Sequence, residues 1–217
     1  MITPPSAQSQ SKDQSAIAIE DGFEIALHAF WDKNRTLILL VCAAALLTII
    51  GREGWQYYVA QHEQSVRDDY AKAADRPEQL ATFAGANSDH ALAGVAYLRL
   101  ADTKYAAADF RAAADNYTKA AASLKNSALL GRAKVGAAMS LFYAGDKAAG
   151  EAALKAIGTD TTLAKSARVE ADFHLATLAL EAGNAAEVSR LVAETSKIDA
   201  GSVWSQRATA LLSIKSE

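Results

Sequence analysis

The distribution of apolar residues divides the chain into three parts. A continuous apolar run extends from Leu37 to Ile50 and is interrupted only by Thr48. The residues before about position 18 are polar and rich in Ser, Gln and Pro, whereas apolar groups recur with helical spacing after position 76. The pattern therefore predicts a polar tail, one membrane-length helix and a folded helical domain.

The flanks of the apolar run extend it to the length of a membrane span. Basic side chains and aromatic rings stand at both ends, as expected where a helix meets the headgroup region. These residues are Trp31, Lys33 and Arg35 before the run, and Arg52, Trp55, Tyr57 and Tyr58 after it. At about 1.5 Å per residue, Trp31 to Trp55 covers roughly 36 Å, which exceeds a hydrocarbon core of about 30 Å. The sequence predicts a transmembrane helix over residues 35–55.

The apolar run has three other interpretations. A lipoprotein signal would need a cysteine at the end of the run, but Cys42 lies in its interior. A buried core helix is also apolar all round, although charges and rings seldom flank it on both sides. A cleaved signal peptide would need small residues after the run, but Arg52 and Glu53 stand there. For a spanning helix, Lys33 and Arg35 outnumber Arg52, and this bias favours a cytoplasmic N-terminus.

The remaining segments are predicted from composition. Residues 1–18 are expected to be a disordered cytoplasmic tail because they contain few large apolar groups. Residues 19–34 are expected to be an amphipathic juxtamembrane segment, with an ordinary helical lead-in to the span as the alternative. Residues 56–76 contain no Pro or Gly before the break at Pro77, which predicts a helical stalk. The compact domain is expected to span residues 77–217.

Short breaks recur within this domain at a regular spacing. Each break is a small residue followed by Asp or Asn, at Ala108-Asp109, Gly145-Asp146 and Gly183-Asn184, with spacings of 37 and 38 residues. A glycine can end one helix in a left-handed conformation, and the side chain that follows can cap the next helix. A period of this length is typical of an array of helical hairpins.

Aligned on these breaks, the domain resembles the tetratricopeptide repeat. The first unit carries the resemblance best, at Tyr97, Leu100, Ala101, Asp109, Phe110, Ala113, Tyr117 and Ala120. The second unit has Gly150, and the third has Val188, where the family usually has alanine. The resemblance implies an all-α fold. A single N-terminal transmembrane helix would be followed by a tetratricopeptide-repeat-like α-solenoid of about three helical hairpins, with residues 203–214 as a C-terminal capping helix.

The whole layout resembles the ancillary SecYEG translocon subunit family (YfgM-like). The resemblance rests on the order of tail, span, stalk and repeats, and on the cluster Gly-Arg-Glu-Gly-Trp-Gln-Tyr-Tyr at positions 51–58. It implies a single-pass protein of the bacterial inner membrane whose repeats lie in the periplasm. It also implies the Sec translocon and periplasmic chaperones as protein partners.

Composition and motifs predict that the protein binds other molecules and does not catalyse a reaction. A net charge of -3 over 217 residues does not favour the basic face that nucleic-acid binding needs, so no nucleic-acid partner is expected. The single cysteine, Cys42, excludes an intramolecular disulfide and a multi-cysteine zinc site. The sequence has no His-Glu-x-x-His pair, phosphate loop or Gly-x-Ser-x-Gly elbow. We therefore expect no enzyme activity, no catalytic residue, no metal and no cofactor.

The repeat positions that usually face the inner groove predict a partner-binding site. They are Leu98, Asp102 and Tyr105 in the first unit, Arg132, Val135, Met139, Phe142 and Tyr143 in the second, and Glu170, Phe173, Thr177 and Leu180 in the third. This mixture of apolar, aromatic and charged groups suits an extended or helical segment of a partner. The alternative is that Met139, Phe142 and Phe173 belong to the core between helices.

Two functions follow from these expectations. The first is a membrane-anchored interaction scaffold, an accessory of the Sec translocon that links it to periplasmic chaperones and contacts lipid through its anchor. The second is a self-associating structural protein of the cell envelope, whose repeats form a homo-oligomer.

Overall fold

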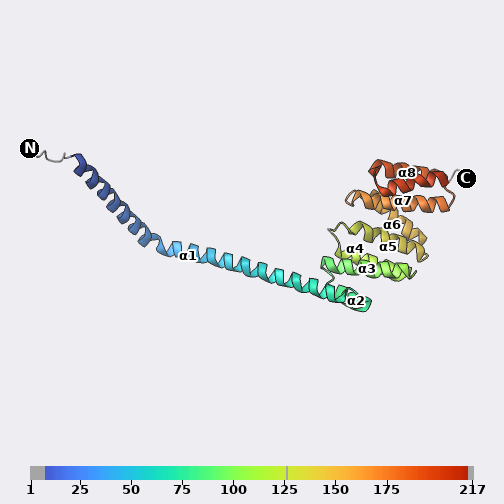
Figure 1. Ribbon diagram of the computed structural model, residues 1–217, viewed down its shortest axis with the longest axis horizontal. Coiled ribbons are helices and arrows are strands. Elements are labelled where there is room, and N and C mark those ends of the chain that lie inside the picture. The colour runs from blue at the N-terminus through green and yellow to red at the C-terminus, as the bar shows by residue number, and fades with distance from the viewer. Residues whose placement is uncertain (1–7, 126, 215–217) are drawn as a thin grey trace, which may run out of the picture. The chain divides into compact units, whose positions relative to one another are not determined.

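Every regular element in the described part of the chain is an α-helix (Figure 1). The fold is seen in a computed structural model, which describes residues 8–125 and 127–214. The first helix, α1 (Gln8–Ala73), contains the apolar run. The helices that follow are α2 (Pro77–Ala86), α3 (Ala91–Ala106), α4 (Phe110–Ser123), α5 (Leu130–Tyr143), α6 (Lys147–Thr159), α7 (Lys165–Glu181), α8 (Ala185–Asp199) and α9 (Val203–Ile214). The predicted all-α fold is confirmed.

Helix α1 joins segments that the sequence predicts as separate. Residues 8–18, expected as part of a disordered tail, are helical, while residues 1–7 lie outside the described residues. No Pro or Gly occurs between Gln8 and Ala18, so the backbone is free to form a helix there. The predicted juxtamembrane segment, span and most of the stalk also belong to α1, and the helix ends at Ala73, before Pro77.

The repeat domain begins earlier than residue 77. The chain divides into a first unit that ends at His62 and a second that begins at Glu63. Val66 and Ala73 are buried in one cluster with residues of α2 and α3, and the Tyr70 ring meets the edge of Phe83 at 5.6 Å. Most of the predicted stalk past His62 is therefore a packed helix of the domain, because its apolar residues recur every three to four positions.

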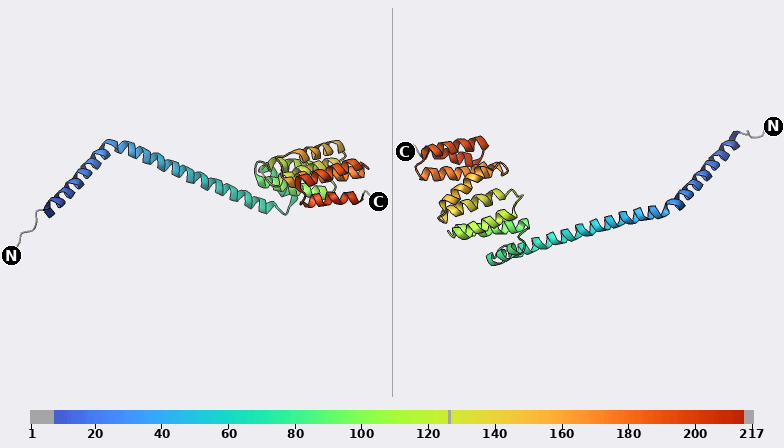
Figure 2. Two further views of the ribbon diagram at one scale, coloured as in Figure 1. Left: turned by 90° about the horizontal axis from the view of Figure 1, so that it is seen from above. Right: turned by 180° about the vertical axis from the view of Figure 1, so that it is seen from behind.

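Three further hairpins follow in chain order. Helices α3–α4, α5–α6 and α7–α8 pair as hairpins, neighbouring hairpins pack on one another, and α9 packs on α7 and α8 (Figure 2). The turns of these hairpins have left-handed backbones, with φ of 57° at Ala108, 101° at Gly145 and 71° at Gly183. The caps predicted after them are also present, because the side chains of Asp109, Asp146 and Asn184 accept from the N–H groups of Ala112, Ala149 and Glu187.

Glycine and alanine allow the paired helices to approach closely. A Cβ at Gly150 of α6 would lie 2.8 Å from the carbonyl oxygen of Ala138 in α5, a distance that side chains do not tolerate. A Cβ at Gly136 would lie 2.7 Å from the ring of Tyr117. The close crossing of α5 and α6 therefore explains why position 150 is glycine, where the repeat usually has alanine.

Candidate partner-binding surface

The first unit exposes an apolar helix. Within the described residues, one helix is long and apolar enough to cross a membrane, and none of its most apolar window is buried. This exposure contradicts the interpretation of the run as the core helix of a soluble domain, because a core helix is covered by its neighbours. The predicted flanking residues are all exposed on α1: Trp31, Arg35, Arg52, Trp55, Tyr57 and Tyr58.

Two of the predicted groove residues form an ion pair between hairpins. Arg132 Nη2 of α5 lies 2.6 Å from Asp102 Oδ2 of α3. The hydroxyl of Tyr117 donates to the other oxygen of Asp102 at 2.7 Å. Burial and this hydrogen bond raise the pKa of Tyr117 well above its ordinary range. Burial also raises the pKa of Glu170 on α7, although Arg132 opposes the shift. The Arg132–Asp102 ion pair therefore connects α3 and α5, the first helices of successive hairpins.

Three other predicted groove residues are core. Leu98 is 4% exposed in the cluster between α3 and α4, and Met139 is 7% exposed in the cluster that α5 shares with later helices. Val135 is buried beside Met139. The expectation that a partner contacts these side chains is corrected, because the faces on which they lie are covered by neighbouring helices.

Four aromatic rings gather where the first two complete hairpins turn. We call Tyr105, Phe110, Phe142 and Tyr143 the aromatic cluster. The ring centroids of Tyr105 and Phe110 are 5.2 Å apart, and those of Phe110 and Tyr143 are 5.3 Å apart. Tyr143 is 47% exposed, whereas Tyr105 and Phe142 pack partly against the core. The groove prediction missed Phe110, although the Asp-Phe pair after the first break was a usable signal.

Phe173 belongs to a second aromatic group. Its ring centroid lies 5.3 Å from that of Trp204 in α9, and Arg207 stacks over Trp204 at 4.8 Å. His174 lies 5.9 Å from the same tryptophan, and burial lowers its pKa. The sequence predicts α9 as a capping helix, but the contact of Trp204 with Phe173 has no signal in the sequence. The remaining predicted residues, Glu170, Thr177 and Leu180, are half-buried on α7.

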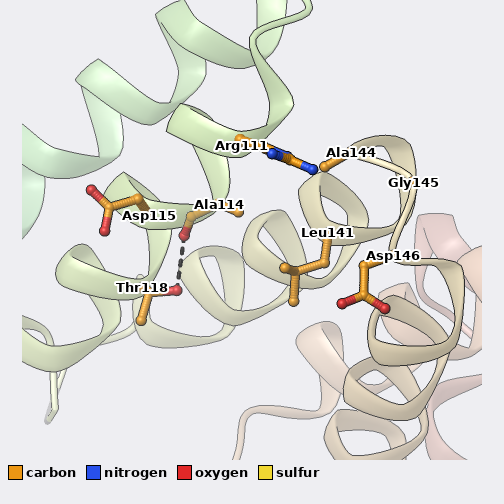
Figure 3. A pocket seen from close by; sticks show the side chains of 8 residues that line it. All are labelled: Arg111, Ala114, Asp115, Thr118, Leu141, Ala144, Gly145 and Asp146. Carbon is orange, nitrogen blue, oxygen red and sulfur yellow. Dashed lines mark hydrogen bonds between the residues drawn. The ribbon is translucent and has the colours of Figure 1, made fainter.

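Two adjoining hollows between α4, α5 and α6 were not predicted. We call them together the α4–α6 groove. The larger hollow, of about 720 Å³, is lined by Arg111, Ala114, Asp115, Thr118, Leu141, Ala144, Gly145 and Asp146 (Figure 3). The smaller one, of about 330 Å³, shares Thr118 and Leu141 and has mainly alanine walls. Alanine is abundant throughout the domain, so no sequence signal indicates which alanines line a hollow.

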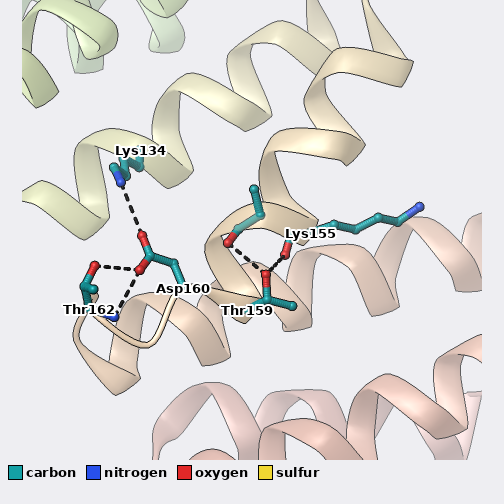
Figure 4. Close-up of polar contacts among 6 residues, drawn as sticks. Lys134, Lys155, Thr159, Asp160 and Thr162 are labelled. Carbon is teal, nitrogen blue, oxygen red and sulfur yellow. Dashed lines mark hydrogen bonds and ion pairs between the residues drawn. The ribbon is translucent and has the colours of Figure 1, made fainter.

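A polar contact contributes to the wall of the smaller hollow. Lys134 Nζ of α5 lies 3.6 Å from Asp160, which follows α6, and both residues line the smaller hollow (Figure 4). The N–H of Thr162 donates to Asp160 at 3.0 Å. Hydrogen bonds from Thr162, followed by the charge of Lys134, lower the pKa of Asp160. This carboxylate therefore stays ionised and ties the loop after α6 to α5.

The titratable groups do not suggest a metal centre. Among the described residues, no three His, Cys, Asp or Glu side chains come together in a way that could hold a metal ion. His90 has a structural role: its Nδ1 accepts from the N–H of Leu92 and caps α3, while its Nε2 lies 3.1 Å from Glu63 Oε1. The pair ties the end of α1 to the start of α3.

Comparison with known proteins identifies the family. The model of the tetratricopeptide repeat-like domain matches residues 28–186, which is more than half of the chain. The chain belongs to this family. The match begins in α1 and ends in the first turn of α8, so it includes the apolar run together with the first two complete hairpins. No curated protein and no solved structure gives a significant match. The predicted repeat is confirmed, and the resemblance to the translocon subunit family stays a prediction.

Proposed function

We propose that this protein is a protein-interaction scaffold held at a membrane by its N-terminal helix. The proposal depends on one observation. The residues that match the tetratricopeptide repeat-like domain include both an exposed apolar helix and helical hairpins. Stacked helical hairpins present extended surfaces, which these repeats use to bind other proteins. An uncovered apolar helix needs an apolar environment, and a bilayer provides one.

The finer proposal places this scaffold at protein export. We propose that the anchor spans the bacterial inner membrane, with the repeats in the periplasm, and that the protein connects the Sec translocon with periplasmic chaperones. The basic bias of Lys33 and Arg35 over Arg52 supports this topology. The cluster at positions 51–58 supports the assignment to this system. Its action would be binding, without a chemical step.

Two surfaces are suited to a partner. In the aromatic cluster, Tyr143 is exposed and can contact a partner. Aromatic side chains are over-represented among the interface residues that contribute most of the binding energy. The α4–α6 groove offers a concave apolar wall next to Thr118. Leu98 and Met139 are excluded from both surfaces by burial.

Photo-crosslinking in cells tests the proposal. A photoreactive amino acid is placed at Tyr143 and, in a second variant, at Thr118, with the exposed Lys197 of α8 as the control position. We expect mass spectrometry to identify translocon subunits or periplasmic chaperones from at least one of the first two positions, and none from Lys197. Adducts to lipid alone would contradict the scaffold. Adducts between two copies of the chain alone would favour the structural homo-oligomer.

A further inference from the structure

A third hollow lies between α6, α7 and α8, apart from the α4–α6 groove. Its volume is about 450 Å³, within the range of small-molecule sites. Charged groups of both signs line it: Lys155, Arg168, Asp172, Arg190 and Glu194. The presence of both signs of charge and the modest size suit a small polar molecule better than an apolar segment of a protein.

Asp172 is the unusual group in this hollow. The residue is 6% exposed, and its carboxylate forms no hydrogen bond or ion pair with the described residues. Gly158 of α6 makes room for the carboxylate, since a Cβ there would collide with Asp172 Oδ1. Buried carboxylates without donors are costly, and burial raises the pKa of Asp172 to about 6.

The neighbouring cations do not pair with Asp172 because other groups hold them. Glu187 accepts two hydrogen bonds from Arg190, at 2.8 and 2.7 Å. Arg168 donates its Nε–H to the carbonyl oxygen of Gly158 at 3.0 Å. Arg168 lines the hollow, and its terminal N–H groups make no hydrogen bond to the described residues. A carboxylate acceptor and a guanidinium donor therefore line the same space.

We propose that this hollow binds a small zwitterion, in which two to four bonds separate the ammonium nitrogen from the carboxyl carbon or phosphorus atom of the anionic group. The ammonium group donates to Asp172, with Glu194 close by. The anionic group accepts from Arg168 and is attracted by Lys155. Both free amino acids and the ethanolamine phosphate headgroup of a phospholipid have this chemistry. The site is distinct from the partner-binding surfaces, because none of its residues lines the α4–α6 groove or belongs to the aromatic cluster.

Calorimetric titration of the detergent-solubilised full-length chain tests this site. The probes are L-alanine and O-phosphoethanolamine, with sodium acetate and ethylammonium chloride as controls that carry one charge each. We expect at least one zwitterion to bind, and both singly charged controls to bind roughly tenfold more weakly or worse, since each leaves one charged group unpaired. Binding of L-alanine alone identifies a free amino acid as the ligand, and binding of O-phosphoethanolamine alone identifies the headgroup.

Two variants separate the site from general effects on the protein. Asp172→Asn keeps the shape of the side chain and removes a buried charge, so the domain should fold; it should weaken zwitterion binding by roughly tenfold or more. Glu181→Gln changes an exposed carboxylate of the same helix and should leave binding unchanged. The proposal is overturned if neither zwitterion binds to the wild-type chain, or if Asp172→Asn binds as tightly as Glu181→Gln.

Discussion

Ser140 and Ser205 are two buried hydroxyl groups in helices of the repeat domain. The hydroxyl of Ser205 has carbonyl acceptors at Asp199, 2.6 Å away, and at Thr195, 3.0 Å away. The hydroxyl of Ser140 is fully buried and has no hydrogen-bond partner within the described structure. The same side chain is therefore satisfied in one place and unsatisfied in the other.

This difference predicts opposite effects of replacing each serine by alanine. Ser140→Ala should leave stability unchanged or raise it by up to about 1 kcal/mol, since it removes an unsatisfied hydroxyl. Ser205→Ala should lower stability by about 1 kcal/mol, since it removes the hydrogen bonds of the hydroxyl to the carbonyl oxygens of Asp199 and Thr195. Urea unfolding of the repeat domain in the detergent-solubilised chain, followed by circular dichroism, measures both. A larger loss for Ser140→Ala than for Ser205→Ala would contradict this account.

The stability of the domain should depend on pH through Asp172. Because its pKa is raised to about 6, the folded chain holds a proton between about pH 4 and 6 that the unfolded chain releases. The folded state is thus favoured at low pH and loses this contribution as the pH rises through 6. Asp172→Asn should therefore increase the unfolding free energy by about 2 kcal/mol at pH 8 and by nearly nothing at pH 4.

Urea unfolding at the two pH values checks this prediction. Asp115→Asn is the matched control, since Asp115 is an exposed residue paired with Lys119 at 2.7 Å. That variant should not stabilise the domain at either pH. If Asp172→Asn destabilised the domain at pH 8, the ionised carboxylate would be favourable in the folded state. That result would contradict the prediction that the ionised form is destabilised by burial.

At the scale of elements, the hairpin turns have one shared geometry but different residues. Ala108, Gly145 and Gly183 all have positive φ, and alanine is strained there because its Cβ approaches the following carbonyl oxygen. Ala108→Gly should stabilise the domain by up to about 1 kcal/mol. This net value is the strain that is relieved in the folded state, reduced by the greater conformational entropy of glycine in the unfolded chain. Gly145→Ala and Gly183→Ala should each destabilise it by about 1 kcal/mol. Thermal and urea unfolding measure these differences, and a loss of stability in Ala108→Gly would contradict the strain.

The close contact between α5 and α6 requires glycine for a different reason. Gly150→Ala should destabilise the domain by roughly 1–3 kcal/mol, because the added methyl group has backbone atoms 2.8 Å away and the helices must separate. Gly85→Ala is the matched control in helix α2, where a Cβ meets nothing within 4 Å. It should stabilise α2 by about 0.5–1 kcal/mol through helix propensity. Equal effects of the two changes in urea unfolding would argue against a tight crossing.

At the scale of the whole molecule, the exposed apolar helix should decide where the protein resides. Ala44→Arg places a charge near the middle of the apolar run, at a cost of about 2.5–3.5 kcal/mol for insertion. We expect a smaller share of the chain in the membrane fraction after carbonate extraction of cells. Ala44→Leu keeps the run apolar and should fractionate as the wild type does. Full membrane retention of Ala44→Arg would indicate an attachment other than this span.

Local features of the fold could be predicted from the sequence because they depend on neighbouring residues. The apolar run, the helix ends at Gly145 and Gly183 and the caps at Asp109, Asp146 and Asn184 are set within a few positions of the chain. Their spacing was enough to predict the helical repeat, which the family match confirms. Left-handed glycine followed by a capping side chain has a direct sequence signature.

Only the tertiary structure decided which side chains reach the surface. Repeat positions placed Leu98 and Met139 in a groove, yet neighbouring hairpins cover them, and the packing of Val66 and Tyr70 moves the start of the domain into α1. The α4–α6 groove and the buried carboxylate of Asp172 depend on the distances between helices that are remote in sequence. Burial is a property of the assembled helices: the order of residues determines which face is apolar, and packing determines which parts of that face are covered.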